Sequence, residues 1–290
     1  MPTKIEKDSV TGIMTTGHEW DGLKELNNPL PKWWLYTLYA CIAFAAVYVV
    51  LYPAFPFQGA TGVTGHIARE AVVREIAEAN GRMAPMVNRI RDATPEAIAA
   101  DPELRSFAMA GGRIAFANNC AACHGAGGQG ATGGFPSLAD DDWIWGGSFA
   151  AIHATITHGI RAGESDEERI SQMPRFVADG VLTLAQANDT AEYVLHLSGR
   201  STDAAARGRG ETLYAENCVA CHGEQGEGNR DVGAPRLNDR VWLYGADKQA
   251  IARMIANPRQ GVMPSWGRRL DPAVVNMLTV YVHALGGGER

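Results

Sequence analysis

The sequence predicts one N-terminal membrane-spanning helix followed by two copies of one helical domain. Three observations support this prediction: a run of twenty uncharged residues near the N-terminus, a Cys-x-x-Cys-His motif that occurs twice, and an internal repeat around both motifs. At 290 residues the chain is long enough for about two domains of ordinary size. The net charge of −6 does not favour a nucleic-acid partner.

The N-terminal part of the chain combines a polar tail, residues 1–32, with an apolar run, residues 33–52. Aromatic residues crowd both ends of the run, as they do where a helix meets the two interfaces of a bilayer. A buried helix of a globular domain is the alternative. No small-residue cleavage site lies near the end of the run, so we expect an uncleaved anchor. Lys24 and Lys32 flank one side, and the first basic residue on the other side is Arg69, which favours a cytoplasmic N-terminus.

Residues 53–104 form the predicted connector between the membrane and the repeats. Its first part, residues 53–66, is rich in Gly, Pro and Thr and is typical of a linker. The composition then becomes helical, with Pro85 as the expected break or kink. We interpret this segment as an amphipathic connector without a ligand role.

The repeated motif carries the chemistry of the chain. The motif residues are Cys120, Cys123 and His124 in the first copy and Cys218, Cys221 and His222 in the second. Cys-x-x-Cys-His is the attachment signature of c-type haem, in which two thiols bond covalently to one haem and the histidine reaches its iron. Zinc sites and redox-active thiol pairs also use Cys-x-x-Cys. The adjacent histidine, present twice, favours two covalently bound haem c groups.

The repeat begins before each motif. A glycine lies eight residues, and an aromatic residue four residues, before the first motif cysteine; these are Gly112 and Phe116 in one copy and Gly210 and Tyr214 in the other. This spacing predicts a helix whose glycine permits the close approach of another backbone.

The repeat continues after each motif. Residues 134–147 match residues 233–246, and each copy then closes with a Met-Pro pair, at Met173 and at Met263, and a further helical segment. The two units are therefore one fold, duplicated.

These features resemble two class I cytochrome c domains in tandem, covering residues 105–199 and 204–290. The resemblance implies an all-α fold in which the helix before the motif packs on the C-terminal helix of the domain. It also implies that His124 and His222 are the proximal iron ligands, and that Met173 and Met263 are the distal ones. A thioether ligand raises the reduction potential of haem iron, which suits a carrier that passes electrons toward a strong oxidant.

Two further features bear on the ligands. Pro136 and Pro235 match the family position whose carbonyl accepts the N–H of the proximal imidazole and fixes its ring. His153 and His158 lie between the first motif and the first Met-Pro pair, so coordination of the first haem by two histidines stays open.

The tail carries a second resemblance. Residues 17–34, GHEWDGLKELNNPLPKWW, resemble the N-terminal entry of the diheme subunit of cbb3-type cytochrome c oxidases, the CcoP or FixP type. This resemblance covers essentially the whole chain. It implies a single-pass anchor in the bacterial inner membrane, with both haem domains in the periplasm. Electrons would come from a donor c-type cytochrome and pass, through the monohaem subunit, to the catalytic haem–copper subunit.

The possible functions differ in whether the haems only transfer electrons or also catalyse a reaction. The sequence offers no copper site and no general acid–base constellation, so we expect a non-catalytic electron-transfer subunit of an oxidoreductase complex. A free-standing membrane cytochrome, or the cytochrome subunit of a periplasmic dehydrogenase, fits the haem domains equally well. A diheme peroxidase is a third alternative, and it would require one haem with an open or displaceable distal position.

Overall fold

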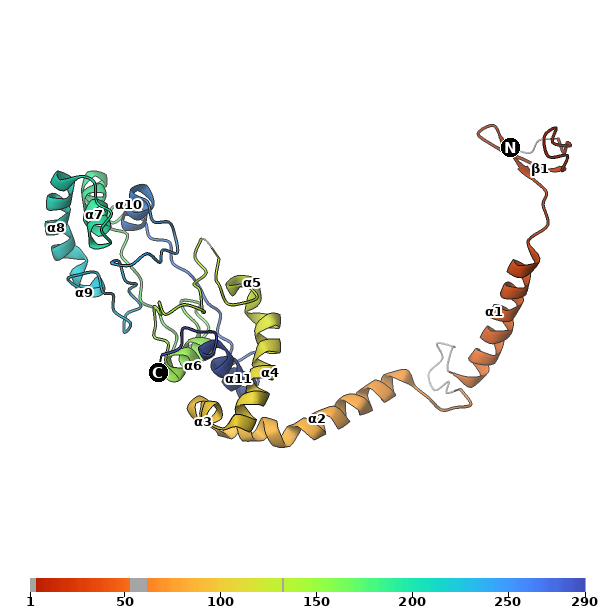
Figure 1. The fold of residues 1–290 in the computed structure, drawn as a ribbon, viewed down its shortest axis with the longest axis horizontal. Helices are drawn as coiled ribbons and strands as arrows, with labels where there is room; N and C mark the ends of the chain where they lie inside the picture. Colours follow the sequence, from red (N-terminus) through yellow and green to blue (C-terminus); the bar gives the residue numbers. More distant parts are fainter. Residues whose placement is uncertain (1–3, 53–61, 132, 290) are drawn as a thin grey trace. The chain divides into compact units, whose positions relative to one another are not determined.

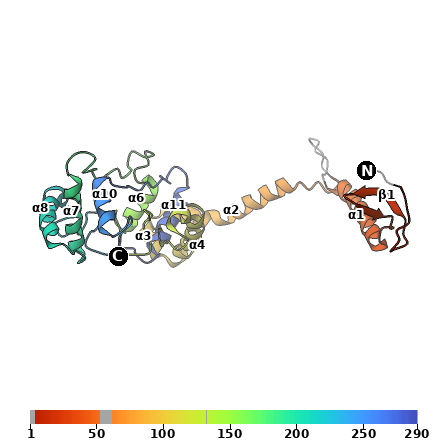
Figure 2. The same ribbon diagram turned by 90° about the horizontal axis from the view of Figure 1, so that it is seen from above.

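The computed structural model describes residues 4–52, 62–131 and 133–289 and is mostly helical (Figures 1 and 2). The chain divides into two compact units, Met1–Gly81 and Arg82–Arg290. The elements are β1 (Thr15–Trp20), β2 (Leu23–Leu26), α1 (Lys32–Leu51), α2 (Ala68–Asp92), α3 (Pro95–Ala100), α4 (Pro102–Asn119), α5 (Ala121–His124), α6 (Phe149–His158), α7 (Leu184–Leu197), α8 (Ala204–Asn217), α9 (Val219–His222), α10 (Lys248–Ala256) and α11 (Pro272–His283).

The N-terminal tail forms an antiparallel hairpin of β1 and β2 that the sequence analysis did not predict. Asp21 and Gly22 connect the strands with φ angles of +49° and +87°. An Asp-Gly pair favours the two-residue hairpin turn that needs positive φ at both positions. Trp20 pairs with Leu23 across the turn, and the indole N–H of Trp20 donates to a Glu25 carboxylate oxygen at 3.2 Å. The tail therefore has a defined local structure.

Helix α1 has the length and composition of a membrane-spanning helix. It begins after Pro31 and covers 20 residues, matching the apolar run at 33–52 within one residue. Within the described parts of the chain, it is the one helix long and apolar enough to cross a membrane, and none of its residues is buried.

Helix α2 connects to the second unit. It continues through Pro85, which was expected to break or kink it. The start of the connector, residues 53–61, lies outside the described residues.

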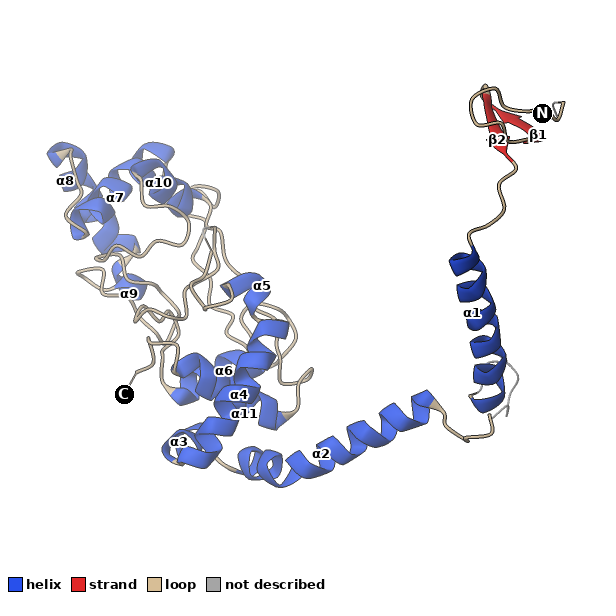
Figure 3. Ribbon diagram, turned by 45° about the vertical axis from the view of Figure 1, so that its right-hand side comes forward, coloured by secondary structure: helices blue, strands red, loops and turns tan. Residues whose placement is uncertain are grey.

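The helices of the second unit form two lobes (Figures 1 and 3). Lobe 1 contains α4, α5, α6 and α11, and lobe 2 contains α7, α8, α9 and α10. The two closest helix pairs are α4 with α11 and α7 with α8. The C-terminal helix of each sequence repeat therefore packs on the N-terminal helix of the other repeat. This packing differs from the expectation that each repeat closes on itself.

Two glycines permit these crossings. A Cβ atom on Gly112 of α4 would lie 2.5 Å from the carbonyl oxygen of Met277 in α11. On Gly210 of α8 it would lie 2.0 Å from the carbonyl oxygen of Asp189 in α7. Any side chain larger than hydrogen would push the helix backbones apart, as the sequence analysis predicted for these glycines.

An aromatic pair lies one helical turn beyond each glycine. Phe116 of α4 meets Tyr281 of α11 with ring centroids 5.4 Å apart. Tyr214 of α8 meets Tyr193 of α7 at 5.1 Å. Phe116 and Tyr214 are both about 1% exposed. The matching geometry shows that the two lobes repeat one packing arrangement.

Lobe 1 also holds the end of α2 and the short helix α3. Ile90 of α2 and Ile98 of α3 are fully buried against α4 and α11. The side-chain amide of Asn276 in α11 donates to the Ile90 carbonyl oxygen at 2.9 Å. An ion pair at 3.0 Å joins Arg91 to Asp271, which caps α11. The connector is thereby fixed to the last helix of the chain.

A buried carboxylate holds the segment between the repeats. Glu192 of α7 is 1% exposed and accepts hydrogen bonds from the Ser201 hydroxyl and from the backbone N–H groups of Thr202 and Asp203, at 2.6 to 3.0 Å. The Lys248 ammonium lies 2.7 Å away. Burial alone would raise the pKa of Glu192, but the ion pair and hydrogen bonds outweigh it and lower the pKa to about 2.

We expect Gly210→Ala to destabilise lobe 2, because its new methyl group would overlap the backbone of α7. The expected loss in the free energy of unfolding is about 1–3 kcal/mol. Gly208→Ala is the matched control, since a Cβ at Gly208 on the same helix meets nothing within 4 Å. Its higher helix propensity should stabilise by up to about 1 kcal/mol. Thermal unfolding of both variants tests this, and equal stabilities would contradict the crossing of α7 and α8.

We expect Glu192→Gln to lower the free energy of unfolding at neutral pH by about 1–3 kcal/mol, because the variant loses the charge that Lys248 and three N–H or O–H donors stabilise. A carboxylate with a depressed folded-state pKa stabilises the fold above its unfolded pKa of about 4.5. This contribution disappears as the pH falls toward 2. Unfolding midpoints measured from neutral to acidic pH should converge for wild type and variant; a constant difference would refute the assignment.

Candidate haem sites

Both Cys-x-x-Cys-His motifs occupy the same local structure. Cys120 ends α4, and its backbone N–H donates to the Phe116 carbonyl oxygen at 2.8 Å. The motif then forms α5, which Gly125 ends with φ of +79°. Cys218 and Gly223 hold the same places at the end of α8 and of α9, and Gly223 also has φ of +79°. The two thiols of each motif are therefore presented on one short helical turn.

Each motif histidine contacts the carbonyl oxygen of the proline predicted to orient it. His124 Nδ1 lies 3.0 Å from the Pro136 carbonyl oxygen, and His222 Nδ1 lies 2.9 Å from that of Pro235. Burial lowers the pKa of both imidazoles, although the proline carbonyls oppose this shift. Because Nδ1 donates to a carbonyl in the neutral ring, Nε2 is the nitrogen available to a metal.

No disulfide joins the four motif cysteines within the described residues. Burial, together with the neighbouring thiol, raises the pKa of Cys120 and of Cys218 to about 11, whereas Cys123 and Cys221 are exposed. In the part of the chain that the structure describes, no three His, Cys, Asp or Glu side chains gather as a metal cluster would require. Each motif thus presents two thiols, the number that covalent attachment of one haem c requires.

The structure brings each Met-Pro methionine to the motif of the other repeat. Met263 packs on the lobe 1 cluster that includes Phe116, and Cys120 packs on the same cluster. Met173 packs on the lobe 2 cluster that includes Cys218. The sequence could not decide whether each methionine lies beside the motif of its own repeat. The arrangement follows from the exchange of α7 and α11, because the methionine loops precede these helices.

The Met263 loop is anchored on α6 and the residues after it. Met263 and Ile160 exchange two backbone hydrogen bonds, each 2.9 Å long. The Ser265 hydroxyl donates to the Thr157 carbonyl oxygen at 2.7 Å, and the Ser265 N–H donates to a Glu164 carboxylate oxygen at 2.9 Å. Four backbone and side-chain bonds therefore hold this loop of the second repeat on the first repeat.

The Met173 loop is held by the second repeat in the same way. The Gln260 side-chain amide donates to the Met173 carbonyl oxygen at 3.1 Å. Phe176, three residues later, is 8% exposed and lies in the lobe 2 cluster with Ile251 and Ile255 of α10. Lobe 2 therefore contains the first repeat's methionine beside the second repeat's motif.

The two histidines that stayed open as ligands have other contacts. His158 Nδ1 lies 3.1 Å from the Ser165 hydroxyl and its Nε2 lies 3.4 Å from a Glu167 carboxylate oxygen. His153 Nδ1 lies 3.4 Å from the Thr157 hydroxyl. Ile152 and Ile156 of α6 are buried in the lobe 1 cluster, whereas both histidines are partly buried. This arrangement favours methionine as the distal ligand.

An unpaired guanidinium nitrogen shows that lobe 2 fits an anionic group. Arg200 lies over the ring of Trp242 at 5.1 Å, donates from Nε to the Ser198 hydroxyl and donates from Nη1 to the Ala246 carbonyl oxygen. Its Nη2 is buried without a hydrogen-bond partner among the described residues. A buried donor needs a partner, and a haem carries two carboxylates. Sequence reasoning missed Arg200, because only the fold brings it beside Trp242.

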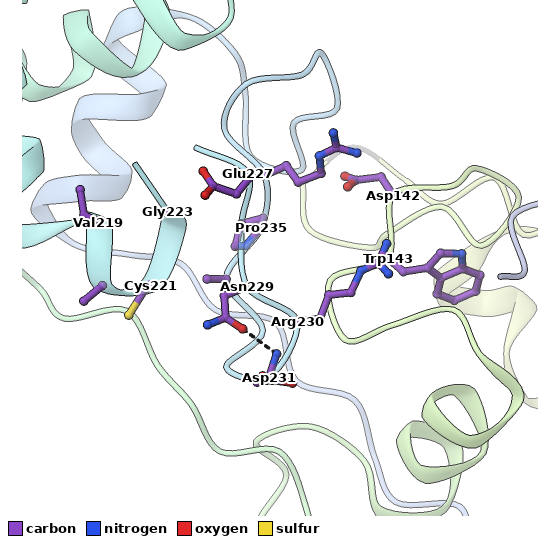
Figure 4. Close-up of a pocket in the computed structure, with 14 residues that line it drawn as sticks. Asp142, Trp143, Val219, Cys221, Gly223, Glu227, Asn229, Arg230, Asp231 and Pro235 are labelled. Carbon is purple, nitrogen blue, oxygen red and sulfur yellow. Dashed lines mark hydrogen bonds between the residues drawn. The ribbon is translucent and has the colours of Figure 1, made fainter. Parts of the chain in front are cut away.

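A pocket of about 520 Å³ borders the second motif (Figure 4). Cys221 and Pro235 line it from the second repeat, and Asp142 and Trp143 line it from the first. Burial, and then the negative charge of Asp239, raises the pKa of Asp142 to about 6. Residues of both repeats thus surround the second motif. The methionine beside this motif, Met173, also comes from the first repeat.

Three parts of the chain match known protein families. Residues 12–58 match the N-terminal domain of cytochrome oxidase-cbb3, FixP. Residues 108–198 match the cytochrome c family, and residues 205–282 match subunit III of cbb3-type cytochrome c oxidase.

Relatives match over nearly the full length. The chain is 52% identical to the cbb3-type cytochrome c oxidase subunit CcoP of Azospirillum brasilense, covering 98% of this chain and 99% of the relative. It is 50% identical to CcoP of Cereibacter sphaeroides, covering 100% of both chains. It is 50% identical to the FixP subunit of Azorhizobium caulinodans, covering 97% of this chain and 96% of the relative.

Proposed function

Because the chain belongs to the CcoP and FixP family of cbb3-type cytochrome c oxidase subunits, we propose that it carries electrons within that oxidase. It accepts them from a donor c-type cytochrome and delivers them, through the monohaem subunit, to the haem–copper subunit. The observation that supports this role most directly is the presence of two equivalent sites. Each combines a Cys-x-x-Cys-His motif, a carbonyl-bound histidine and a packed methionine.

The two sites bind two haem c groups in this proposal. Cys120 and Cys123 form the thioether bonds of the first, and Cys218 and Cys221 those of the second. Haem c supplies an iron that alternates between its ferric and ferrous states. Pro136 and Pro235 hold the imidazole Nδ1–H groups of the two proximal ligands, His124 and His222, so that Nε2 faces the iron position.

The distal side of each site comes from the other repeat. Met263 serves the first haem and Met173 the second, and both thioethers stabilise ferrous iron and raise the reduction potential. Phe116 and Tyr214, each about 1% exposed, provide a buried apolar residue one helical turn before the first cysteine of each motif. The unpaired Nη2 of Arg200 provides a donor for a haem carboxylate in lobe 2.

The membrane arrangement follows from α1 and its flanking charges. Helix α1 anchors the subunit in the bacterial inner membrane as a single span. Lys24 and Lys32 place the N-terminus in the cytoplasm, and the haem lobes therefore lie in the periplasm. The hairpin of β1 and β2 then lies at the cytoplasmic surface, where Trp20 and Leu23 at its turn are 62% and 76% exposed. These two side chains provide a contact for a neighbouring oxidase subunit.

We expect Met263→Ala to alter the haem bound by the first motif and Met173→Ala to alter the haem bound by the second. Replacing Cys218 and Cys221 by Ala should leave a protein with the first haem alone, as mass spectrometry of the denatured chain can verify. In that single-haem protein, Met263→Ala should lower the reduction potential and allow the ferrous haem to bind carbon monoxide. Met173→Ala should leave both properties unchanged.

The same titrations distinguish the rival ligand sets. A lowered potential in the single-haem Met173→Ala protein would show that each repeat supplies its own methionine. Loss of the native potential in His153→Ala or His158→Ala, with no change in Met263→Ala, would show a haem with two histidine ligands. Carbon monoxide binding by the unmodified ferrous protein would indicate an open distal position, as a diheme peroxidase requires.

We expect deletion of residues 2–28, with Lys32 and α1 retained, to leave both haems attached and redox-active but to reduce co-purification with other oxidase subunits. Oxygen consumption by membranes should fall in parallel.

Replacing Trp20 and Leu23 together by Ser should have the same effect at smaller magnitude, because these apolar side chains are exposed at the hairpin turn. Val10→Ser is the matched control, since Val10 is 89% exposed outside both strands. Normal assembly of the truncated protein, or co-purification of the intact protein with a dehydrogenase, would contradict the oxidase role of this tail.

A further inference from the structure

Arg161 lies in the segment that leaves lobe 1 after α6 and leads toward lobe 2. It is partly buried and has φ of +52°, a left-handed conformation that residues other than glycine seldom adopt. Only Asp21, in the turn of the hairpin, shares this property among the described non-glycine residues. The fold therefore holds Arg161 in an unfavourable backbone conformation. In this conformation its side chain reaches the carbonyl oxygens of Gly261 and Ser171.

The guanidinium of Arg161 joins the two methionine loops. Its Nε donates to the Gly261 carbonyl oxygen at 2.9 Å, and its Nη1 donates to the Ser171 carbonyl oxygen at 2.8 Å. Gly261 lies two residues before Met263, and Ser171 lies two residues before Met173. One side chain thus bonds to the equivalent position of both loops, although the loops belong to different lobes.

The two methionine loops also meet directly beside Arg161. Gln260, next to Gly261, donates its side-chain amide to the Met173 carbonyl oxygen at 3.1 Å. Ile160, next to Arg161, exchanges two backbone hydrogen bonds with Met263. A pocket of about 440 Å³ at this junction is lined by residues of both loops, among them Met173 and Val262, and by Arg161 itself. A movement of either loop would therefore be transmitted to the other through these bonds.

The charge of Arg161 is not balanced by an ion pair within the described residues, where its side-chain hydrogen bonds go to two backbone carbonyl oxygens. The guanidinium fork fits this task, because its donors are fixed in one plane and can reach two acceptors at once. A positive charge near iron favours the ferrous state, which carries one positive charge fewer than the ferric state.

We propose that Arg161 is a shared positioning residue for the axial methionines of both haems. By bonding to Ser171 and Gly261 it fixes both loops at once, so that the ligation and the potentials of the two haems change together. This inference rests on the proposed function, in particular on the axial roles of Met173 and Met263.

The test uses the full-length diheme protein in detergent, with Arg161→Gln as the principal variant. We expect the absorption band that is characteristic of methionine-ligated ferric haem to weaken for both haems, and both reduction potentials to fall. Haem content, measured on the denatured chain, should stay at the wild-type level. Arg161→Gly serves if the Gln variant does not accumulate, because glycine accepts the positive φ and removes only the side chain.

Two further variants separate positioning from charge. Arg161→Lys keeps the charge but offers no planar fork, so it should recover the potentials in part while the methionine bands remain weakened. Arg175→Gln removes a positive charge two residues after Met173; because Arg175 is 61% exposed and pairs with Asp179, this variant should leave the methionine bands intact.

The absorption bands and reduction potentials of the Arg161 variants decide whether Arg161 positions both methionine loops. Weakened bands and lowered potentials for both haems in Arg161→Gln support the proposal. An effect on one haem alone, wild-type bands in Arg161→Gln, or full recovery by Arg161→Lys would overturn it. Met173→Ala and Met263→Ala, measured in parallel, test the proposed function separately: if they leave both bands unchanged, the axial assignment fails, and with it the premise of the Arg161 proposal.

Discussion

The close crossing of helices from opposite repeats is the contact on which both candidate haem sites depend. Gly112 allows the backbone of α4 to touch α11, and Gly210 allows α8 to touch α7. An aromatic pair then fills the space one turn beyond each glycine, next to the first cysteine of each motif. Because the methionine loops lead into α7 and α11, these crossings also decide which methionine reaches which motif.

Each lobe contains helices from both repeats, because α7 and α11 each pack on the N-terminal helix of the other repeat. Lobe 1 requires contacts such as Asn276 with Ile90 and Ser265 with Thr157, whose partners are more than 100 residues apart in the sequence. Contacts of such long range slow folding, because much of the chain must be ordered before they form. They also mean that the motif of each repeat lies beside the methionine of the other, and the two methionine loops meet at the junction where Arg161 lies.

Much of this structure could be predicted from short stretches of sequence. The apolar run gives α1 within one residue, and the two motifs give the positions of the thiols and proximal histidines. The prolines at 136 and 235 and the glycines at 112 and 210 act as their positions in the repeat predict. The hairpin was missed although Asp21-Gly22 is a strong local signal for it. These features were predicted from residues close together in the chain, where spacing fixes geometry, although the partner helix of each glycine lies elsewhere in the sequence.

Only the tertiary structure decided how the halves of the two repeats pair. The repeats present nearly equivalent surfaces, since Tyr193 and Tyr281 occupy matching positions on α7 and α11 and either helix suits either glycine-bearing partner. The same holds for Met173 and Met263, which share the Met-Pro signal that marks both loops. The contact of Arg200 with Trp242 and the bridging position of Arg161 likewise carry no local signature. The sequence by itself therefore determined the local geometry of each Cys-x-x-Cys-His motif and its histidine, whereas long-range packing determined which methionine lies beside which motif, because contacts between similar helices depend on the path of the whole chain.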